Sequence, residues 1–172
     1  MILGIDPSTV STGWALMSGS VSRGTTINSY GVIKLKGTMI ERVGKFFHEL
    51  FQILIENEVN CIAIETPFVG KNIATYGKLS MLRGAIYVLA NQFSIEVIEL
   101  PPTKVKQLIT ARGNATKQEL ASVLKKRYSK LPDNLCDDIT DAIGIAYSGL
   151  IMFQYKGTAN EERKAKKRKT KK

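Results

Sequence analysis

The residues Met1-Ile2-Leu3-Gly4-Ile5-Asp6 form a short apolar run that ends in a carboxylate. A run of this length predicts a strand buried inside a sheet. A second run of the same kind, Cys61-Ile62-Ala63-Ile64-Glu65, also ends in an acid and is followed by Pro67. If the two strands are neighbours in the sheet, Asp6 and Glu65 lie side by side at their carboxyl ends. The two runs therefore predict a functional site at this edge of the sheet.

The pattern around these two runs alternates between strand and helix periodicity. Three more strands are predicted at 13–18, 26–35 and 94–99, and helices are predicted at Met39–Glu56, Ile73–Gln92, 103–111, 116–129 and 135–153. Three strands are thus followed by helix, strand, helix, strand and helices. This order predicts an α/β fold with a five-stranded mixed sheet flanked by helices, with a meander on one side and crossovers on the other.

Length and charge suggest one domain with a basic extension. The chain has 172 residues, which suits one globular domain over 1–155, and a basic, disordered tail is expected over 156–172. The net charge is +10, and it is concentrated in two places. Residues 101–130 carry eight Lys and Arg against Glu119, and the tail carries nine against Glu161 and Glu162. Such clusters attract a polyphosphate partner, although a charged tail is also typical of a solvated segment.

The apolar segments and the cysteines set the expected location. No stretch reaches the roughly 20 apolar residues of a membrane-spanning helix, and the chain begins in strand-like sequence without a basic leader. Cys61 and Cys136 lack metal-type spacing and are expected to be reduced thiols. We therefore expect a cytoplasmic protein with no membrane contact, in a bacterial cell or a phage-infected host.

Two further acids extend the pair at the strand ends. Asp138 and Asp141 are three residues apart in a predicted helix and therefore share a face. Four carboxylates with little Cys or His nearby favour a hard cation, Mg²⁺ with Mn²⁺ as a substitute. Two such ions could clamp the attacking and leaving oxygens of a phosphoryl displacement. Asp137 could join or replace Asp138, and each acid alone could be a turn or helix-start residue.

The motifs in this order resemble those of RuvC-type Holliday junction resolvases. The resemblance rests on Gly4-Ile5-Asp6-Pro7 with Thr12-Gly13-Trp14, on Ile64 through Asn72, on Val105-Lys106-Gln107 with Gly113-Asn114-Ala115-Thr116-Lys117, and on Asp138-Ile139-Thr140-Asp141-Ala142-Ile143. It implies an RNase H-like fold, a homodimer, and symmetric Mg²⁺-dependent nicks across four-way junctions in DNA recombination and repair.

The resemblance also implies roles for particular residues. Asp6, Glu65, Asp138 and Asp141 match the family's metal-binding acids, and Lys106 and Lys117 match its basic residues near the scissile phosphate. Further DNA-binding candidates are Phe68, placed at the junction centre, Lys71, Asn72, Lys78, Arg83, Lys104 and Arg112. Phe68 alone could also be a core residue, and the two lysines could be solvated surface residues. Ser8 and Tyr147-Ser148 depart from the family pattern, which favours a phage-like or divergent bacterial member.

Several alternatives stay open at this point. A relaxed nuclease for branched DNA or for RNA–DNA hybrids would use the same fold, and a non-catalytic nucleic-acid binder would keep it. A sugar-kinase or actin-like ATPase also begins with a strand and Gly-Ile-Asp but needs a second domain. The apolar surface of Ile73–Gln92 suits both core and dimer contact, or core alone. The sequence does not identify a branch-migration helicase as a partner.

Overall fold

The computed structural model describes residues 1–66 and 73–169, with side chains described as far as residue 158. One sheet has the strand order β3-β2-β1-β4-β5. Its strands are β1 (Ile2–Asp6), β2 (Ser11–Ser20), β3 (Gly24–Lys34), β4 (Cys61–Glu65) and β5 (Glu96–Leu100). The first three pair antiparallel, whereas β1–β4 and β4–β5 are parallel. The predicted mixed sheet, with its meander and crossovers, is therefore confirmed.

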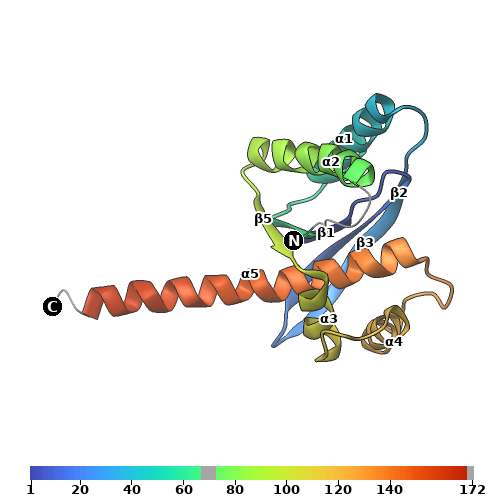
Figure 1. Ribbon diagram of the computed structural model, residues 1–172. Coiled ribbons are helices and arrows are strands. Elements are labelled where there is room, and N and C mark those ends of the chain that lie inside the picture. The colour runs from blue at the N-terminus through green and yellow to red at the C-terminus, as the bar shows by residue number, and fades with distance from the viewer. Residues whose placement is uncertain (67–72, 170–172) are drawn as a thin grey trace.

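Helices cover both faces of this sheet (Figure 1). The helices are α1 (Met39–Glu56), α2 (Ile73–Gln92), α3 (Pro102–Thr110), α4 (Lys117–Arg127) and α5 (Asp137–Lys169). Because strand side chains alternate between faces, Leu3 and Ile5 of β1 pack with α1 and α2 in one core cluster. Ile2 packs with α5, α3 and α4 in the other. The molecule is thus a three-layer sandwich with two cores.

Small residues let α5 lie directly on the middle of the sheet. A Cβ on Gly4 of β1 would stand 2.3 Å from the backbone nitrogen of Ala146, and a Cβ on Gly149 would stand 2.3 Å from the Cβ of Ala63. Real side chains do not tolerate such distances, so glycine is required on both sides of the interface. This close packing fixes the height of α5 above β1 and β4.

Helix α5 is longer than the predicted 135–153. It continues to Lys169 and projects beyond the sheet in Figure 1, so the disorder expected from residue 156 onward is corrected to helix as far as Lys169. The segment 154–169 contains no proline and is rich in Ala, Glu, Lys and Arg, which are strong helix formers. The division into a domain over 1–155 and a basic extension stays a prediction. No helix within the described ranges is long and apolar enough to cross a membrane.

Candidate active site

Asp6 and Glu65 lie at the same edge of the sheet. They are the last residues of β1 and β4, and the parallel register pairs Ile5 with Ile64 immediately before them. Both acids are half-buried. Asp6 and Glu65 therefore lie at adjacent strand ends, as the two apolar runs predict.

The first turn of α5 is brought to this edge by a close backbone contact. Asp6 is paired with Gly13 in the antiparallel β1–β2 register. A Cβ on Gly13 would stand only 1.9 Å from the carbonyl oxygen of Asp138, so the start of α5 touches the main chain of β2. Asp138 and Asp141 are both half-buried there, whereas Asp137 is exposed. Burial thus favours Asp138 over Asp137 as a member of the acidic cluster.

Asp138 has a hydroxyl partner that the sequence patterns did not indicate. The Ser11 hydroxyl donates a hydrogen bond to Oδ2 of Asp138, and the Lys34 ammonium donates to Ser11 Oγ at 2.9 Å. Ser11 and Gly13 are two residues apart in β2 and hence share a face of the sheet. This alternation would point to Ser11 as a partner of α5 only if the contact between Gly13 and α5 were already known.

Two predicted lysines lie near the acids. The Nζ of Lys117 is 2.7 Å from Oδ2 of Asp141. Lys117 begins α4 directly after a capping box in which Thr116 and Glu119 exchange hydrogen bonds, so the cap fixes where this lysine enters the site. Lys106 of α3 is close enough to Glu65 for its charge to lower the pKa of that carboxyl, against the stronger influences that raise it.

The acidic cluster carries more negative charge than its surroundings neutralise. Burial, followed by repulsion from Asp141, raises the pKa of Asp6 to about 6, although Lys117 opposes the shift. Burial, followed by repulsion from Asp6 and Asp141, raises the pKa of Glu65 to about 7. Carboxylates whose ionised forms are disfavoured by burial and by one another gain most from an added cation.

The donor chemistry fits a divalent metal. Carboxylate oxygens are the ligands that Mg²⁺ and Mn²⁺ prefer, and the nearby lysines offset only part of the charge of the cluster. Within the described ranges, however, no three His, Cys, Asp or Glu side chains already stand close enough together to hold an ion. The ammonium of Lys117 stands against Asp141 instead. The acids therefore fit a metal by type and charge, and the lysine contact would have to give way at Asp141.

A small pocket opens beside Asp6 and Glu65. Its wall includes Arg83 of α2 together with Pro7, Thr66, Leu79 and Pro102. Arg83 was predicted to contact DNA, but it is only 7% exposed. Its guanidinium donates to the main-chain oxygen of Glu65 at 2.7 Å and forms an ion pair with Glu99 at 2.6 Å.

The other predicted DNA-binding residues are spread more widely. Lys104 of α3 is half-buried, Lys78 of α2 is exposed, and the exposed Arg112 forms an ion pair with Glu119. Phe68, Lys71 and Asn72 lie outside the described residues. The structure therefore brings Lys106 and Lys117 to the acids but leaves the outer candidates on the surface.

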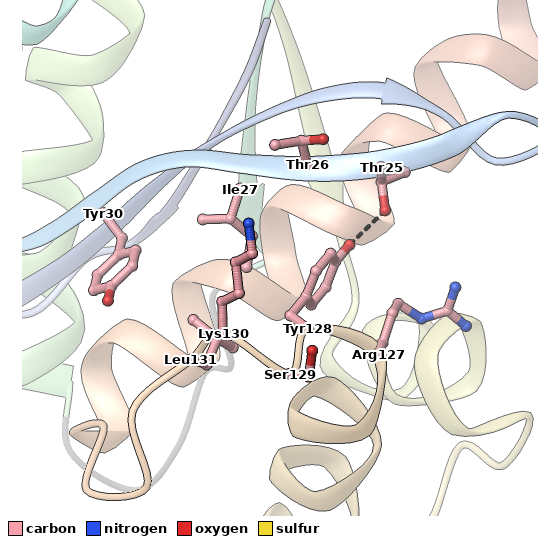
Figure 2. Close-up of a pocket in the computed structure, with 9 residues that line it drawn as sticks. All are labelled: Thr25, Thr26, Ile27, Tyr30, Arg127, Tyr128, Ser129, Lys130 and Leu131. Carbon is pink, nitrogen blue, oxygen red and sulfur yellow. Dashed lines mark hydrogen bonds between the residues drawn. The ribbon is translucent and has the colours of Figure 1, made fainter.

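A larger pocket lies away from the acids, between β3 and the end of α4 (Figure 2). Tyr128 and Thr25 share a hydrogen bond of 2.6 Å across it, and none of the described residues lining it is acidic. Its basic side chains include Arg127, in the last turn of α4, where cations offset the helix dipole. The guanidinium of Arg127 lies 4.7 Å from the ring centroid of Tyr147. These contacts give Arg127 a structural role. We therefore place the candidate active site at the edge of the sheet that carries the acids and not in this pocket.

Comparison with known proteins identifies relatives along most of the chain. The family model for crossover junction endodeoxyribonuclease RuvC matches residues 2–148. A crossover junction endodeoxyribonuclease RuvC of Chlorobium phaeovibrioides is 35% identical over 153 residues, covering 88% of this chain and 81% of the relative. That of Chlamydia felis is 32% identical over 151 residues, covering 85% of this chain and 89% of the relative.

Solved structures share the fold. The structure of Thermus thermophilus RuvC in complex with a Holliday junction substrate superposes with a TM-score of 0.77 at 21% identity, over 86% of this chain and 90% of that one. The yeast mitochondrial Holliday junction resolvase gives 0.60 at 14% identity, over 87% and 77%. These similarities confirm the predicted RNase H-like, resolvase-type α/β fold.

Proposed function

The chain belongs to the RuvC family of crossover junction endodeoxyribonucleases, a family of divalent-metal nucleases, and from this premise we propose that it resolves four-way DNA junctions by phosphodiester hydrolysis. The observation that carries the proposal is the gathering of Asp6, Glu65, Asp138 and Asp141 with Lys117 at one edge of the sheet. Reactions of this kind would serve DNA recombination and repair, and a cytoplasmic location is part of the same proposal.

The four acids are proposed to hold two Mg²⁺ ions, with Mn²⁺ as a substitute. When bound, such ions activate the attacking water and stabilise charge on the leaving oxygen. Asp6 and Glu65 supply ligands from adjacent strand ends, whereas Asp138 and Asp141 supply them from one face of α5. The Ser11 hydroxyl occupies one oxygen of Asp138 and thereby limits how that carboxylate can turn.

Lys117 and Lys106 are proposed to offset the charge that gathers on the phosphate during the reaction. Lys117 has a 67% exposed side chain, so it can turn from Asp141 toward a phosphate without crossing the core. An exposed ion pair of this kind contributes only about 0–1 kcal/mol. The pair therefore holds the lysine at the site without a large cost for its release.

A homodimer is proposed because a four-way junction presents two strands in near two-fold symmetry. Helix α2 has an outward apolar stripe at helical spacing, made of Ile73, Gly77, Met81, Gly84 and Val88, all of them exposed. Its inward face, which includes Leu82, Ile86 and Leu89, is buried in the core. Part of the apolar surface of α2 thus stays exposed after its core contacts are made. This supports the alternative in which one face of the helix packs in the core and the other contacts a partner.

The remaining predicted contacts complete the proposed DNA surface. Phe68 is proposed to stack at the junction centre, and the DNA backbone is proposed to meet Lys71, Asn72, Lys78, Lys104 and Arg112. The basic segment 156–172 is proposed to add attraction for phosphates, since it holds nine Lys and Arg against two Glu.

The test is cleavage of a labelled four-way junction against matched linear duplex, flap, fork and RNA–DNA hybrid substrates, with and without Mg²⁺. Wild type is compared with Asp6→Asn, and Asp137→Asn is the control because Asp137 is exposed. We expect paired, metal-dependent nicks at the junction that are lost in Asp6→Asn and kept in Asp137→Asn. Similar rates on flaps and forks would indicate a relaxed branched-DNA nuclease. Junction binding without cutting in Mg²⁺ or Mn²⁺ would overturn the catalytic proposal.

A further inference from the structure

Arg83 is a buried arginine on the inward face of α2, next to the proposed active site. Burial of an arginine is costly unless its charge and its donors are satisfied. Its side chain is 9% exposed and borders the pocket that Asp6 and Glu65 also line. We therefore expect the contacts of Arg83 within the protein to explain why it is buried at this place.

The guanidinium joins three elements through separate nitrogens. Nη1 donates to the main-chain oxygen of Glu65 at the end of β4 at 2.7 Å. Nη2 donates to Oε2 of Glu99 in β5 at 2.6 Å and to the hydroxyl of Tyr87 in α2 at 3.0 Å. The Tyr87 hydroxyl in turn donates to the other oxygen of Glu99. Arg83 thus ties α2 to two neighbouring strands at the point where β4 ends.

The end of β4 is also held by β5. Glu65 is paired with Leu100 of β5, and the nitrogen of Thr66 donates to the oxygen of Leu100 at 2.8 Å. These contacts hold the strand end from the side of β5. Arg83 holds the Glu65 carbonyl from the side of α2, so the two together fix the peptide plane that follows the Glu65 Cα. The direction of the Glu65 side chain depends on that plane.

We propose that Arg83 is a positioning residue, which fixes the main chain at Glu65 so that its carboxylate meets a divalent cation shared with Asp6. The inference rests on the proposed function, since it presumes that the acids bind metal. Arginine suits the role because its planar fork can bond a carbonyl and a carboxylate at once, whereas a lysine offers a single point charge. Residues that orient a metal ligand in this way commonly change metal affinity when they are replaced.

The first experiment measures Mn²⁺ binding to the full chain by calorimetry in the absence of DNA, with wild type, Arg83→Lys and Tyr87→Phe. We expect Arg83→Lys to bind Mn²⁺ about 10-fold more weakly. Tyr87→Phe keeps the bond from Arg83 to Glu65 and is expected to bind Mn²⁺ like wild type. Equal affinities of wild type and Arg83→Lys would overturn the positioning role.

The second measurement separates positioning from DNA contact. Junction binding is titrated in EDTA over a range of salt concentrations, and a positioning residue is expected to leave both the affinity and the salt dependence unchanged. A phosphate contact would instead weaken binding and reduce the salt slope by about 1, and that result would overturn the inference.

Two further arms keep the outcomes distinct. If Arg83→Lys does not fold, as judged by its melting temperature in EDTA, Glu99→Leu combined with Tyr87→Phe removes both acceptors of the Arg83 Nη2 and is expected to weaken Mn²⁺ binding in the same direction. No weakening in that variant would overturn the proposal. A wild-type chain that binds Mn²⁺ but cuts no junction would overturn the proposed function alone, whereas one that binds no Mn²⁺ would overturn both.

Discussion

The Nζ of Lys117 and the Oδ2 of Asp141 form a 2.7 Å ion pair that joins the start of α4 to the start of α5. The hydrogen bond to Asp141 raises the pKa of Lys117, and Lys117 in turn offsets part of the rise in the pKa of both Asp6 and Glu65. The lysine therefore acts as a resident cation for the whole acidic cluster. A divalent ion bound at Asp141 would compete with it.

This competition predicts opposite effects of Lys117→Ala on metal binding and on catalysis. Removing the ammonium leaves the acids with less positive charge nearby, so Mn²⁺ affinity is expected to rise severalfold. Junction cleavage at saturating metal is expected to fall by roughly 10²-fold, as for the loss of one charge-stabilising donor. The control is Lys125→Ala, in the same helix, whose lysine forms its ion pair with Asp133 away from the cluster. Weaker Mn²⁺ binding by Lys117→Ala would contradict the competition.

The raised pKa values predict how the stability of the metal-free protein depends on pH. Asp6 has a pKa of about 6 against an ordinary value of 3.8, and Glu65 about 7 against 4.5. Because the folded chain holds these protons more tightly than the unfolded chain, both groups cost stability as the pH rises from about 4 to about 7. For Asp6 the cost at neutral pH is on the order of 3 kcal/mol.

Asp6→Asn is therefore expected to melt several degrees above wild type at pH 8 in EDTA and at nearly the same temperature at pH 4. Thermal melts at the two pH values check this, and adding Mn²⁺ at pH 8 is expected to stabilise wild type more than the variant. The exposed Asp137→Asn serves as the control. If Asp6→Asn raises the melting temperature by the same amount at pH 4 and at pH 8, the result would argue against burial of an ionised carboxylate.

Gly13 is predicted to be intolerant of any side chain. Its Cβ would stand 1.9 Å from the carbonyl oxygen of Asp138, so Gly13→Ala must push the start of α5 away from β2. We expect a large drop in melting temperature or, if the protein folds, loss of cleavage with junction binding retained. Gly44→Ala in α1 is the matched control, because nothing lies within 4 Å of its added Cβ. That change is expected to stabilise the helix by up to about 1 kcal/mol.

Sequence patterns predicted most of the fold because the deciding signals are local. The apolar runs ending in Asp6 and Glu65 defined the two strands that turned out to be parallel neighbours, and Thr116 with Glu119 is a local capping signal for α4. The side-chain partners could not be predicted, since Ser11 reaches Asp138 across 127 positions of sequence. Arg83 was among the predicted DNA-binding residues, yet its burial depends on how α2 packs on β4 and β5. The helix α5 extends to Lys169 because the residues of this segment have high helix propensity. The prediction of disorder considered only their charge.

The outward stripe of α2 predicts a dimer that charged substitutions on the stripe disrupt. Met81 and Val88 are 56% and 58% exposed and seven residues apart, so they lie on one line along the helix. Met81→Lys combined with Val88→Lys would bury two ammonium groups from each protomer in a symmetric interface, at a cost that exceeds that of ordinary surface substitutions. We expect wild type to sediment as a dimer at micromolar concentration and the double variant as a monomer.

Ile55→Lys is the matched control, because Ile55 of α1 is similarly exposed, at 52%, and lies outside the stripe. Sedimentation equilibrium gives the masses, and junction cleavage gives the consequence. A monomer presents one site, so the double variant is expected to leave junctions with single nicks in place of paired ones. Dimers that persist in the double variant, or that are lost in Ile55→Lys, would place the partner contact elsewhere. Since Arg83 lies on the inward face of the same helix, unchanged Mn²⁺ affinity in the double variant would show that α2 positions Glu65 without help from a partner.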